Sequence, residues 1–240
     1  MYKAQKEYIL KNVGEIKTIK DLKNAIQFVN NEKISQSTKG LRRQGIKALW
    51  WDCHNYNKEN WSNLEWEMKK IKTEQTKNTI QTHIDKDILN NILKQANTNK
   101  QKLFIKFLAE TGVRVSEMTN IKIKDCRSNG VNIDIKIKCA KTDVLVYKTI
   151  SKELFSLIKN EFKGKTYLFE TSSFSKYSRC YISDQIRVIG KKLNINISAH
   201  TLRAYFITNN INSGKNIIDI SRNVGHLNVG STVQRYYTGV

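Results

Sequence analysis

The feature that most constrains the fold is a change of pattern about a third of the way along the chain. Residues 1–75 carry only helical periodicity, whereas the residues after 81 mix helical segments with short runs of β-branched side chains. Between these regions, residues from about 70 to 81 are polar and aperiodic, which is typical of a linker. The 240 residues suffice for one large domain or two small ones. We therefore predict a helical domain over 1–75, a linker over 76–81 and a second domain over 82–240.

The N-terminal region shows helical periodicity in two segments. Residues 22–29 repeat apolar side chains at helical spacing, after a capping signal in which Thr18 precedes Asp21 by three positions. Residues 35–56 form a longer helical stretch. The expected core positions are Leu22, Ala25, Ile26 and Val29 in the first segment and Leu41, Ile46, Leu49 and Trp50 in the second.

The region after the linker predicts helices around a small sheet. A helix opens near residues 83–87, helical patterns continue to about Thr119, and Asn129-Gly130 then supplies a turn. Short runs rich in β-branched side chains follow, so we expect a mainly α fold with a small antiparallel β-sheet. The β-type runs are 131–138 and 144–150, helices resume from Ser151, and a further short strand candidate spans residues 167–169.

The charge of the chain limits the classes of partner that the chain is expected to bind. Its 42 lysine and arginine residues against 21 aspartate and glutamate residues give a formal net charge of +21, and the pI is about 9.8. A field this positive attracts polyanions, of which nucleic acid is the commonest inside cells. Charge alone does not choose between DNA, RNA and a catalyst that acts on either.

Anionic membrane is the rival surface, but the sequence does not favour it. No apolar run approaches the ~20 residues that a membrane span requires. No segment has the pattern of a long amphipathic helix with a compact basic face. The first seven residues are not followed by the apolar region of a signal peptide. We therefore expect a cytoplasmic protein without a membrane partner.

The cysteines do not indicate a metal site. They form no C-x-x-C pair, and no nearby histidines complete a zinc set. We expect reduced, partly buried thiols, no metal and no other cofactor. The four cysteines are Cys53, Cys126, Cys139 and Cys180.

One N-terminal helix carries a row of basic residues. Lys39, Arg42, Arg43 and Lys47 are three or four positions apart, so they share a helix face. Such a row can follow a DNA backbone or enter a groove, and it can equally be a solvated face. Both interpretations remain open at this point.

Two basic segments of the second region suit phosphate binding. Arg114 follows Gly112, which can end the preceding apolar helix, and a fixed guanidinium there could clamp a phosphate. The alternative is a surface arginine paired with Glu117. His200 and Arg203 lie three positions apart, hence on one helix face, and both could reach one phosphate.

A lysine, a second histidine and a tyrosine complete the set of reactive residues. Lys141 lies between the two β-type runs, where a hairpin tip projects it from the sheet. His226 follows Gly225, and Tyr236 ends a Ser-Thr-Val-Gln-Arg-Tyr segment. Because the unperturbed pKa of tyrosine is about 10, a nucleophilic tyrosine requires positive charge around it. Taken singly, each of these residues also has an ordinary structural interpretation.

The order of these segments resembles the catalytic domain of the tyrosine recombinase family, which includes the phage integrases and the Xer recombinases. The resemblance covers about residues 82–240, and the N-terminal helices resemble the family's core-binding domain only in size, helicity and position. It implies a two-domain DNA clamp with an all-helical N-terminal domain and a mixed α+β catalytic domain. The matching segments are 111–118 for the first-arginine motif, Ala140-Lys141-Thr142 for the hairpin lysine, His200-Thr201-Leu202-Arg203 for the H-x-L-R motif, Gly225-His226 for the G-H motif and 231–236 for the S-T-T-Q-x-Y motif.

The resemblance also implies a role for each residue. Arg114 and Arg203 are expected to clamp the non-bridging oxygens, and Tyr236 to attack the phosphate. Lys141 is expected to protonate the leaving 5′-hydroxyl, and His200 to assist proton transfer from the tyrosine. His226 is expected to donate a hydrogen bond to the phosphate. Such a scheme uses neither metal nor ATP.

As an activity, the resemblance implies site-specific recombination of duplex DNA through a 3′-phosphotyrosyl intermediate. The expected assembly is a homotetramer on two recombination sites, either integrating or excising a mobile element or acting in Xer-like resolution. Two alternatives remain: a catalytically decayed DNA-binding protein and a monomeric type IB topoisomerase-like enzyme.

The sequence departs from the family pattern in three places, and the assignment of the lysine is ambiguous. Ala199 and Ala204 replace a common proline and a common histidine beside the H-x-L-R motif. The family usually places the nucleophile nine residues after the G-H histidine, whereas Tyr236 lies ten residues after it and Tyr237 eleven. The motif context favours Tyr236. Lys138 is the alternative to Lys141, which we prefer because Ala-Lys-Thr lies where the turn should be.

Overall fold

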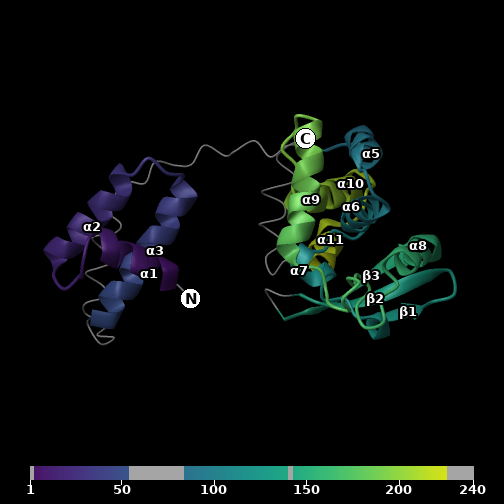
Figure 1. Cartoon of the computed structure of the whole chain (residues 1–240), viewed down its shortest axis with the longest axis horizontal. Coiled ribbons are helices and arrows are strands. Elements are labelled where there is room, and N and C mark those ends of the chain that lie inside the picture. Colours follow the sequence, from purple (N-terminus) through teal and green to yellow (C-terminus); the bar gives the residue numbers. More distant parts are fainter. Residues whose placement is uncertain (1–2, 54–83, 140–142, 226–240) are drawn as a thin grey trace. The chain divides into compact units, whose positions relative to one another are not determined.

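The computed structural model describes residues 3–53, 84–139 and 143–225. The chain divides into two compact units, residues 1–80 and residues 81–240, both drawn in Figure 1. The linker predicted at 76–81 lies outside the described residues. No helix in the described ranges combines the length and the apolar composition that a bilayer crossing requires.

The described part of the first unit consists of helices α1 (Lys3–Asn12), α2 (Ile19–Asn31) and α3 (Gln36–Cys53). The predicted cap of α2 is confirmed, because the Thr18 hydroxyl accepts from the Asp21 amide while the Asp21 carboxylate accepts from the Thr18 amide at 2.9 Å. Both α1 and α2 pack against α3. Their shared core contains Ile9, Ile16, Leu22, Ala25, Ile26, Val29, Ile46, Leu49 and Trp50.

One predicted core position is wrong. Leu41 is 49% exposed. Five helical positions separate it from Ile46, so it lies about 140° around the helix from that residue. The buried face of α3 therefore follows Ile46, Leu49 and Trp50, and Leu41 lies outside it.

The second unit is mainly helical with one small sheet, so the predicted fold class is confirmed. In Figure 1 the sheet and α8 lie at one end of this unit and α5, α6, α9 and α10 at the other. The elements are α5 (Lys86–Gln95), α6 (Asn99–Thr111), α7 (Val115–Met118), a 3-10 turn (Ile123–Asp125), β1 (Cys126–Ser128), β2 (Asn132–Lys138), β3 (Leu145–Ser151), α8 (Lys152–Phe162), α9 (Arg179–Lys192), α10 (Ala199–Asn212) and α11 (Ile217–Asn223).

The sheet is antiparallel in the order β1-β2-β3. Strands β2 and β3 each bury alternate side chains, as expected for a sheet with one face on the core. On β2 the inward residues are all isoleucine, whereas on β3 they are Val146, Lys148 and Ile150. Lys148, opposite Ile135 on β2, therefore occupies a position where the pattern calls for an apolar side chain.

The strands differ from the sequence prediction in two ways. The short β1 was not predicted, because three residues carry no readable alternation. Residues 167–169 form no strand, and Tyr167 makes only an isolated bridge to Lys122. Leu168 and Phe169 are apolar because both are fully buried in the core.

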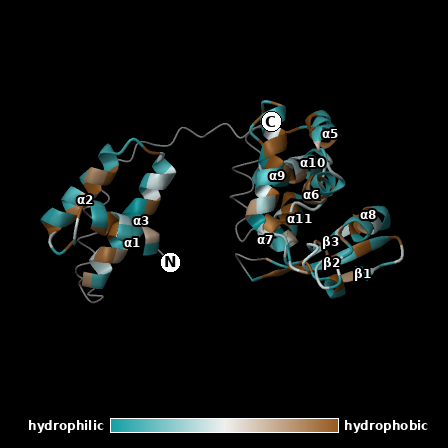
Figure 2. Cartoon of the chain, in the orientation of Figure 1, coloured by the Kyte–Doolittle hydropathy of each residue, from teal (hydrophilic) through white to brown (hydrophobic). Residues whose placement is uncertain are grey.

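The core of the second unit is organised around α6. Phe104 and Phe107 of this helix pack against Phe169, with ring centroids 5.9 Å and 5.0 Å apart. Helices α8, α9 and α10 all contact α6. Figure 2 shows hydrophobic residues interleaved with hydrophilic ones along these elements, as amphipathic packing requires. This core fixes the C-terminal end of α6, where the candidate site begins.

Candidate functional site

The end of α6 forms the base of the site. Gly112 terminates the helix in the left-handed conformation, at φ 62°, and its amide donates to the Leu108 carbonyl at 2.9 Å. The Phe206 ring lies so close that a Cβ on Gly112 would come within 2.4 Å of Phe206 Cδ1. Only glycine fits here, and the sequence prediction that Gly112 ends the helix is confirmed.

Arg114 is held by a buried carboxylate. Its amide donates to Glu117 Oε2 at 2.8 Å, and its Nη1 donates to Glu117 Oε1 at 2.7 Å. The Glu117 side chain is only 2% exposed, whereas the Arg114 side chain is 21% exposed. The contact is therefore not a surface ion pair. It orients the guanidinium and leaves part of the Arg114 side chain open to solvent.

Arg203 connects the ends of two helices. It lies on α10 and is 5% exposed. Its Nη1 donates to the Gly112 carbonyl at 2.6 Å, and its Nη2 donates to the Val224 carbonyl after α11. The structure thus fixes Arg203 on the carbonyl of a residue that lies two positions before Arg114.

His200 lies on the same helix as Arg203, one turn earlier, and is exposed. The first turn of α10 is fixed by a reciprocal cap, in which the Thr201 amide donates to the Ser198 hydroxyl at 3.3 Å and the Ser198 amide donates to the Thr201 hydroxyl at 3.1 Å. The imidazole therefore comes from an ordered helix start, on the solvent side of the buried arginine.

Sequence reasoning missed Lys148, although it lies among these residues. It is 3% exposed, its Nζ donates to Asn223 Oδ1, and it lies 4.9 Å from the centroid of the Phe206 ring. Burial and then the charge of Arg203 lower the pKa of Lys148 to about 7, although Glu117 opposes this shift. The available signal was a lysine at an inward position of an alternating strand, where an unpaired charge is unfavourable.

Three predicted catalytic residues, Lys141, His226 and Tyr236, lie outside the described residues, as does the alternative nucleophile Tyr237. Lys138, the alternative lysine, is described. Its side chain is 64% exposed and lies 3.1 Å from the Asp143 carboxylate.

The described residues that flank Lys141 and precede His226 lie close to one another. Gly225, which precedes His226, has φ 67°, and a Cβ there would come within 2.4 Å of Cys139 Sγ. Cys139 closes the base of the β2-β3 hairpin, because its amide donates to the Val144 carbonyl at 2.8 Å. The chain positions flanking the hairpin loop and preceding His226 therefore lie together, next to the Val224 carbonyl that holds Arg203.

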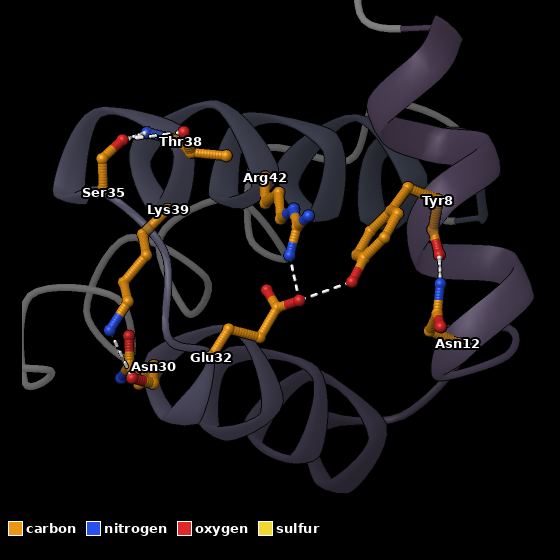
Figure 3. Close-up of polar contacts among 8 residues, drawn as sticks. All are labelled: Tyr8, Asn12, Asn30, Glu32, Ser35, Thr38, Lys39 and Arg42. Carbon is orange, nitrogen blue, oxygen red and sulfur yellow. Dashed lines mark hydrogen bonds and ion pairs between the residues drawn. The ribbon is translucent and has the colours of Figure 1, made fainter.

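The predicted DNA-contacting residues of α3 make contacts within their own unit. Figure 3 shows Arg42 and Tyr8 converging on the same oxygen of Glu32. The Arg42 guanidinium also lies 3.7 Å from the centroid of the Tyr8 ring, and its side chain is 17% exposed. Lys39 Nζ donates to the Asn30 carbonyl at 2.6 Å, and Arg43 Nη2 to Asn30 Oδ1 at 2.5 Å. Lys47 is half-buried and interacts with other residues as well.

Electrostatics supports an architectural role for the Arg42 contact. Burial disfavours the charged form of Glu32, but hydrogen bonds from Arg42 and Tyr8 outweigh burial, so the pKa of Glu32 lies below its usual value. The hydrogen bond to Glu32 in turn raises the pKa of Tyr8. Arg42 therefore joins α3 to α1 and to the end of α2.

The described part of the chain contains no cluster of potential metal ligands. Among residues 3–53, 84–139 and 143–225, no three His, Cys, Asp or Glu side chains are grouped closely enough to hold an ion.

The curated proteins with similar sequences include tyrosine recombinases. Tyrosine recombinase XerA from Pyrococcus horikoshii is 28% identical over 182 residues, which cover 74% of this chain and 63% of that protein. XerA from Saccharolobus solfataricus is 27% identical over 150 residues, which cover 62% of this chain and 50% of that protein. The chain thus spans about half to three fifths of the length of these relatives.

Solved structures share the fold. A Tn1549 transposon integrase in complex with a circular intermediate DNA superposes with a TM-score of 0.75 at 16% identity, covering 98% of this chain and 88% of that chain. The XerH site-specific recombinase bound to its difH substrate gives 0.72 at 21% identity, covering 98% and 73%. The sequence model of the phage integrase family matches residues 82–239, which is most of the chain. This chain therefore belongs to the phage integrase family.

Proposed function

We propose that the chain is a site-specific recombinase that cleaves and rejoins duplex DNA through a 3′-phosphotyrosyl intermediate. The observation that carries the proposal is the pair of fixed guanidinium groups at the end of α6. Glu117 orients Arg114, and the Gly112 carbonyl two residues earlier orients Arg203. Two such groups beside one segment suit the non-bridging oxygens of a single phosphate, because guanidinium donors match phosphate geometry.

The proposed reaction transfers a phosphodiester from DNA to the protein and back. The Tyr236 oxygen attacks the scissile phosphorus and displaces the 5′-oxygen, so one P–O bond forms as another breaks. Negative charge grows on the non-bridging oxygens in the transition state, where Arg114 and Arg203 stabilise it more than they stabilise the ground state. The 5′-hydroxyl of another strand then attacks the phosphotyrosyl bond and restores the tyrosine.

Proton transfers accompany both halves of this reaction. Lys141 gives a proton to the leaving 5′-oxygen, and His200 assists removal of the tyrosine proton. His226 donates a hydrogen bond to the phosphate. The exposed position of His200 on the first turn of α10 supports this role, because a group that handles the proton of an incoming tyrosine must be accessible from outside the core.

The N-terminal unit supplies the second part of the proposed DNA clamp. In this proposal, residues 1–75 form a core-binding domain, 76–81 a linker and 82–240 the catalytic domain. The α3 row of Lys39, Arg42, Arg43 and Lys47 faces the DNA backbone. Arg42 contributes less than the others, because Glu32 neutralises its charge within the unit.

The proposed biological role is recombination between two DNA sites by a homotetramer. Similarity to a transposon integrase and to Xer recombinases supports two settings, integration or excision of a mobile element and Xer-like resolution. Both settings use the same strand exchange, and both agree with the net charge of +21.

The test is covalent attachment to a nicked suicide substrate that carries the cognate site. The wild-type chain should form an adduct that survives denaturing electrophoresis. Tyr236→Phe should abolish the adduct and leave DNA binding intact, whereas the matched control Tyr237→Phe should retain both. An adduct with Tyr236→Phe but not with Tyr237→Phe would assign the nucleophile to Tyr237.

The same assay separates the alternatives. Binding without any adduct from the wild-type chain indicates a decayed DNA-binding protein and overturns the proposal. Relaxation of supercoiled DNA by a monomer, without a second site, indicates a topoisomerase-like enzyme.

A further inference from the structure

Lys148 is a buried lysine that the reaction outlined above does not use. Its neighbours on the inward face of β3 are Val146 and Ile150, and it is 3% exposed. A lysine is rarely this buried unless specific partners hold its ammonium group, because the charge loses its hydration. The identity of those partners therefore indicates what the residue does.

The partners of Lys148 belong to the arginine site. Its Nζ donates to Asn223 Oδ1 at the end of α11 and lies 4.9 Å from the centroid of the Phe206 ring on α10. The same ring covers Gly112, whose carbonyl accepts from Arg203. Lys148 thus joins β3 to two elements that carry or contact the arginine site.

The contact to Asn223 lies one residue before a second ligand of Arg203. The Val224 carbonyl accepts from Arg203 Nη2. Gly225 then packs against Cys139 at the base of the β2-β3 hairpin. Asn223 itself is exposed, whereas Lys148 is buried. Lys148 therefore contacts the last turn of α11 from the core.

We propose that Lys148 is a positioning residue of the phosphate site: it ties β3 to the last turn of α11 through Asn223 and so fixes the carbonyl that orients Arg203. The inference rests on the proposed function, because the phosphate site is part of it. Without the tie, the Val224 carbonyl is free to shift, and Arg203 loses a backbone anchor.

The titratable groups that face Lys148 make this tie sensitive to pH. They are Arg203 on α10, Glu117 on α7 and Cys139 at the end of β2. Burial and Arg203 lower the pKa of Lys148 to about 7, whereas Glu117 and Cys139 raise it. The protonated amine donates a charge-assisted hydrogen bond to Asn223, and the neutral amine donates a weaker one. The tie therefore weakens as pH rises through the pKa of Lys148.

The test measures the rate of adduct formation on the suicide substrate between pH 6 and pH 9. Wild-type activity should fall as pH rises through the pKa of Lys148. Lys148→Met, which keeps an unbranched side chain but lacks the terminal amine, should lower the rate at pH 6.5 on the order of tenfold and lose this fall. Lys136→Met is the matched control, because it removes an exposed lysine from the neighbouring strand and should behave as wild type.

Asn223→Asp provides the diagnostic variant. A carboxylate at this position raises the pKa of Lys148, so the fall in activity should move to higher pH. A residue that only supports folding does not produce this movement. A Lys148→Met enzyme with wild-type rates, or one with a uniformly lower rate and an unchanged pH profile, overturns the inference.

A measurement without DNA separates this inference from the proposed function. If the wild-type chain forms no adduct at any pH, the proposed function fails, and urea unfolding from pH 6.5 to 9.5 then decides whether Lys148 is tied to Asn223. Wild-type stability should rise with pH in this range, Lys148→Met should lack the rise, and Asn223→Asp should reduce it. The same slope in all three proteins overturns the tie.

Discussion

Arg42 of the N-terminal unit and the buried Arg203 and Lys148 of the second unit are held in different ways. In the N-terminal unit, Arg42 is paired with the carboxylate of Glu32, which cancels its charge. In the second unit, Arg203 donates to two backbone carbonyls and Lys148 donates to an amide oxygen. These acceptors are neutral oxygens, unlike the carboxylate of Glu32. A cation neutralised by a carboxylate joins helices, whereas a cation held by neutral oxygens can still attract a phosphate.

Arg114 is intermediate between these two arrangements. Glu117 neutralises it and is buried, but the Arg114 side chain remains 21% exposed. The arginine can therefore be positioned by the carboxylate and still present donors to a ligand. The comparison predicts that loss of Arg203 affects chemistry most, and that loss of Arg42 affects stability.

The largest expected effect is on Arg203. Arg203→Met should lower the rate of adduct formation on the order of a hundredfold or more, because a preorganised donor to the transition state is lost. The rate is measured on the suicide substrate, alongside DNA affinity. A variant that folds and cleaves at the wild-type rate would contradict the assignment of Arg203 to the phosphate.

Arg42→Met should act on stability. It leaves the Glu32 carboxylate without its ion pair and should reduce the free energy of unfolding by about 2 kcal/mol, measured by urea denaturation. The double variant Arg42→Met with Glu32→Gln should be less destabilised than the two single changes predict by addition. Loss of DNA affinity without loss of stability would place Arg42 on the DNA instead and break the comparison.

The pH dependence of stability should differ between the units. The pKa of Lys148 is lowered to about 7 in the folded chain, so between about pH 7 and pH 10 the unfolded chain binds the additional proton. Stability should therefore rise with pH by up to roughly 1.4 kcal/mol per pH unit in that window. Lys148→Met should remove this rise, as measured by chemical unfolding at a series of pH values.

Glu32 should act at the opposite end of the pH range. The pKa of Glu32 is lowered in the folded chain, so its stabilisation is present at neutral pH and is lost as pH falls through its folded pKa. Glu32→Gln should flatten the acid limb of the stability curve without changing the rise between about pH 7 and pH 10 that Lys148 produces. A change of that rise in this variant would contradict the separation of the two effects.

The smallest effect concerns the basic row of α3. Lys47→Ala should weaken DNA binding to a similar degree on all sequences, and should make the slope of log affinity against log salt less steep by about 1. Arg42→Met should change this slope less, because Glu32 already neutralises that arginine. A larger change with Arg42→Met, measured under conditions where the variant is folded, would reverse the proposed ranking.

Features that depend only on residues close together in the chain could be predicted from the sequence. The Thr18 cap, the helix end at Gly112 and the two alternating strands each depend on a few neighbouring residues, and all were predicted. The buried pairing of Arg114 with Glu117 was also visible as an i, i+3 spacing, although its burial was not.

The remaining contacts depend on residues far apart in the chain. Lys148 and Asn223 are separated by 75 positions, and the Arg42 and Glu32 pair joins two helices. A lysine in a strand and a basic row on a helix both predict exposed charges, because burial of such groups is uncommon. The partners that permit burial become apparent only when the helices pack.

The central claim is that a tyrosine of this chain becomes linked to DNA at the arginine site. The most direct measurement is mass spectrometry of the adduct after nuclease and trypsin digestion. Cleavage after Arg235 releases a peptide that begins Tyr236-Tyr237, and fragmentation distinguishes the two tyrosines. We predict a nucleotide that is attached through its 3′-phosphate to the Tyr236 oxygen. Two results would contradict the central claim. One is attachment of the nucleotide to any residue other than these two tyrosines, and the other is no adduct from a folded chain that binds the cognate site.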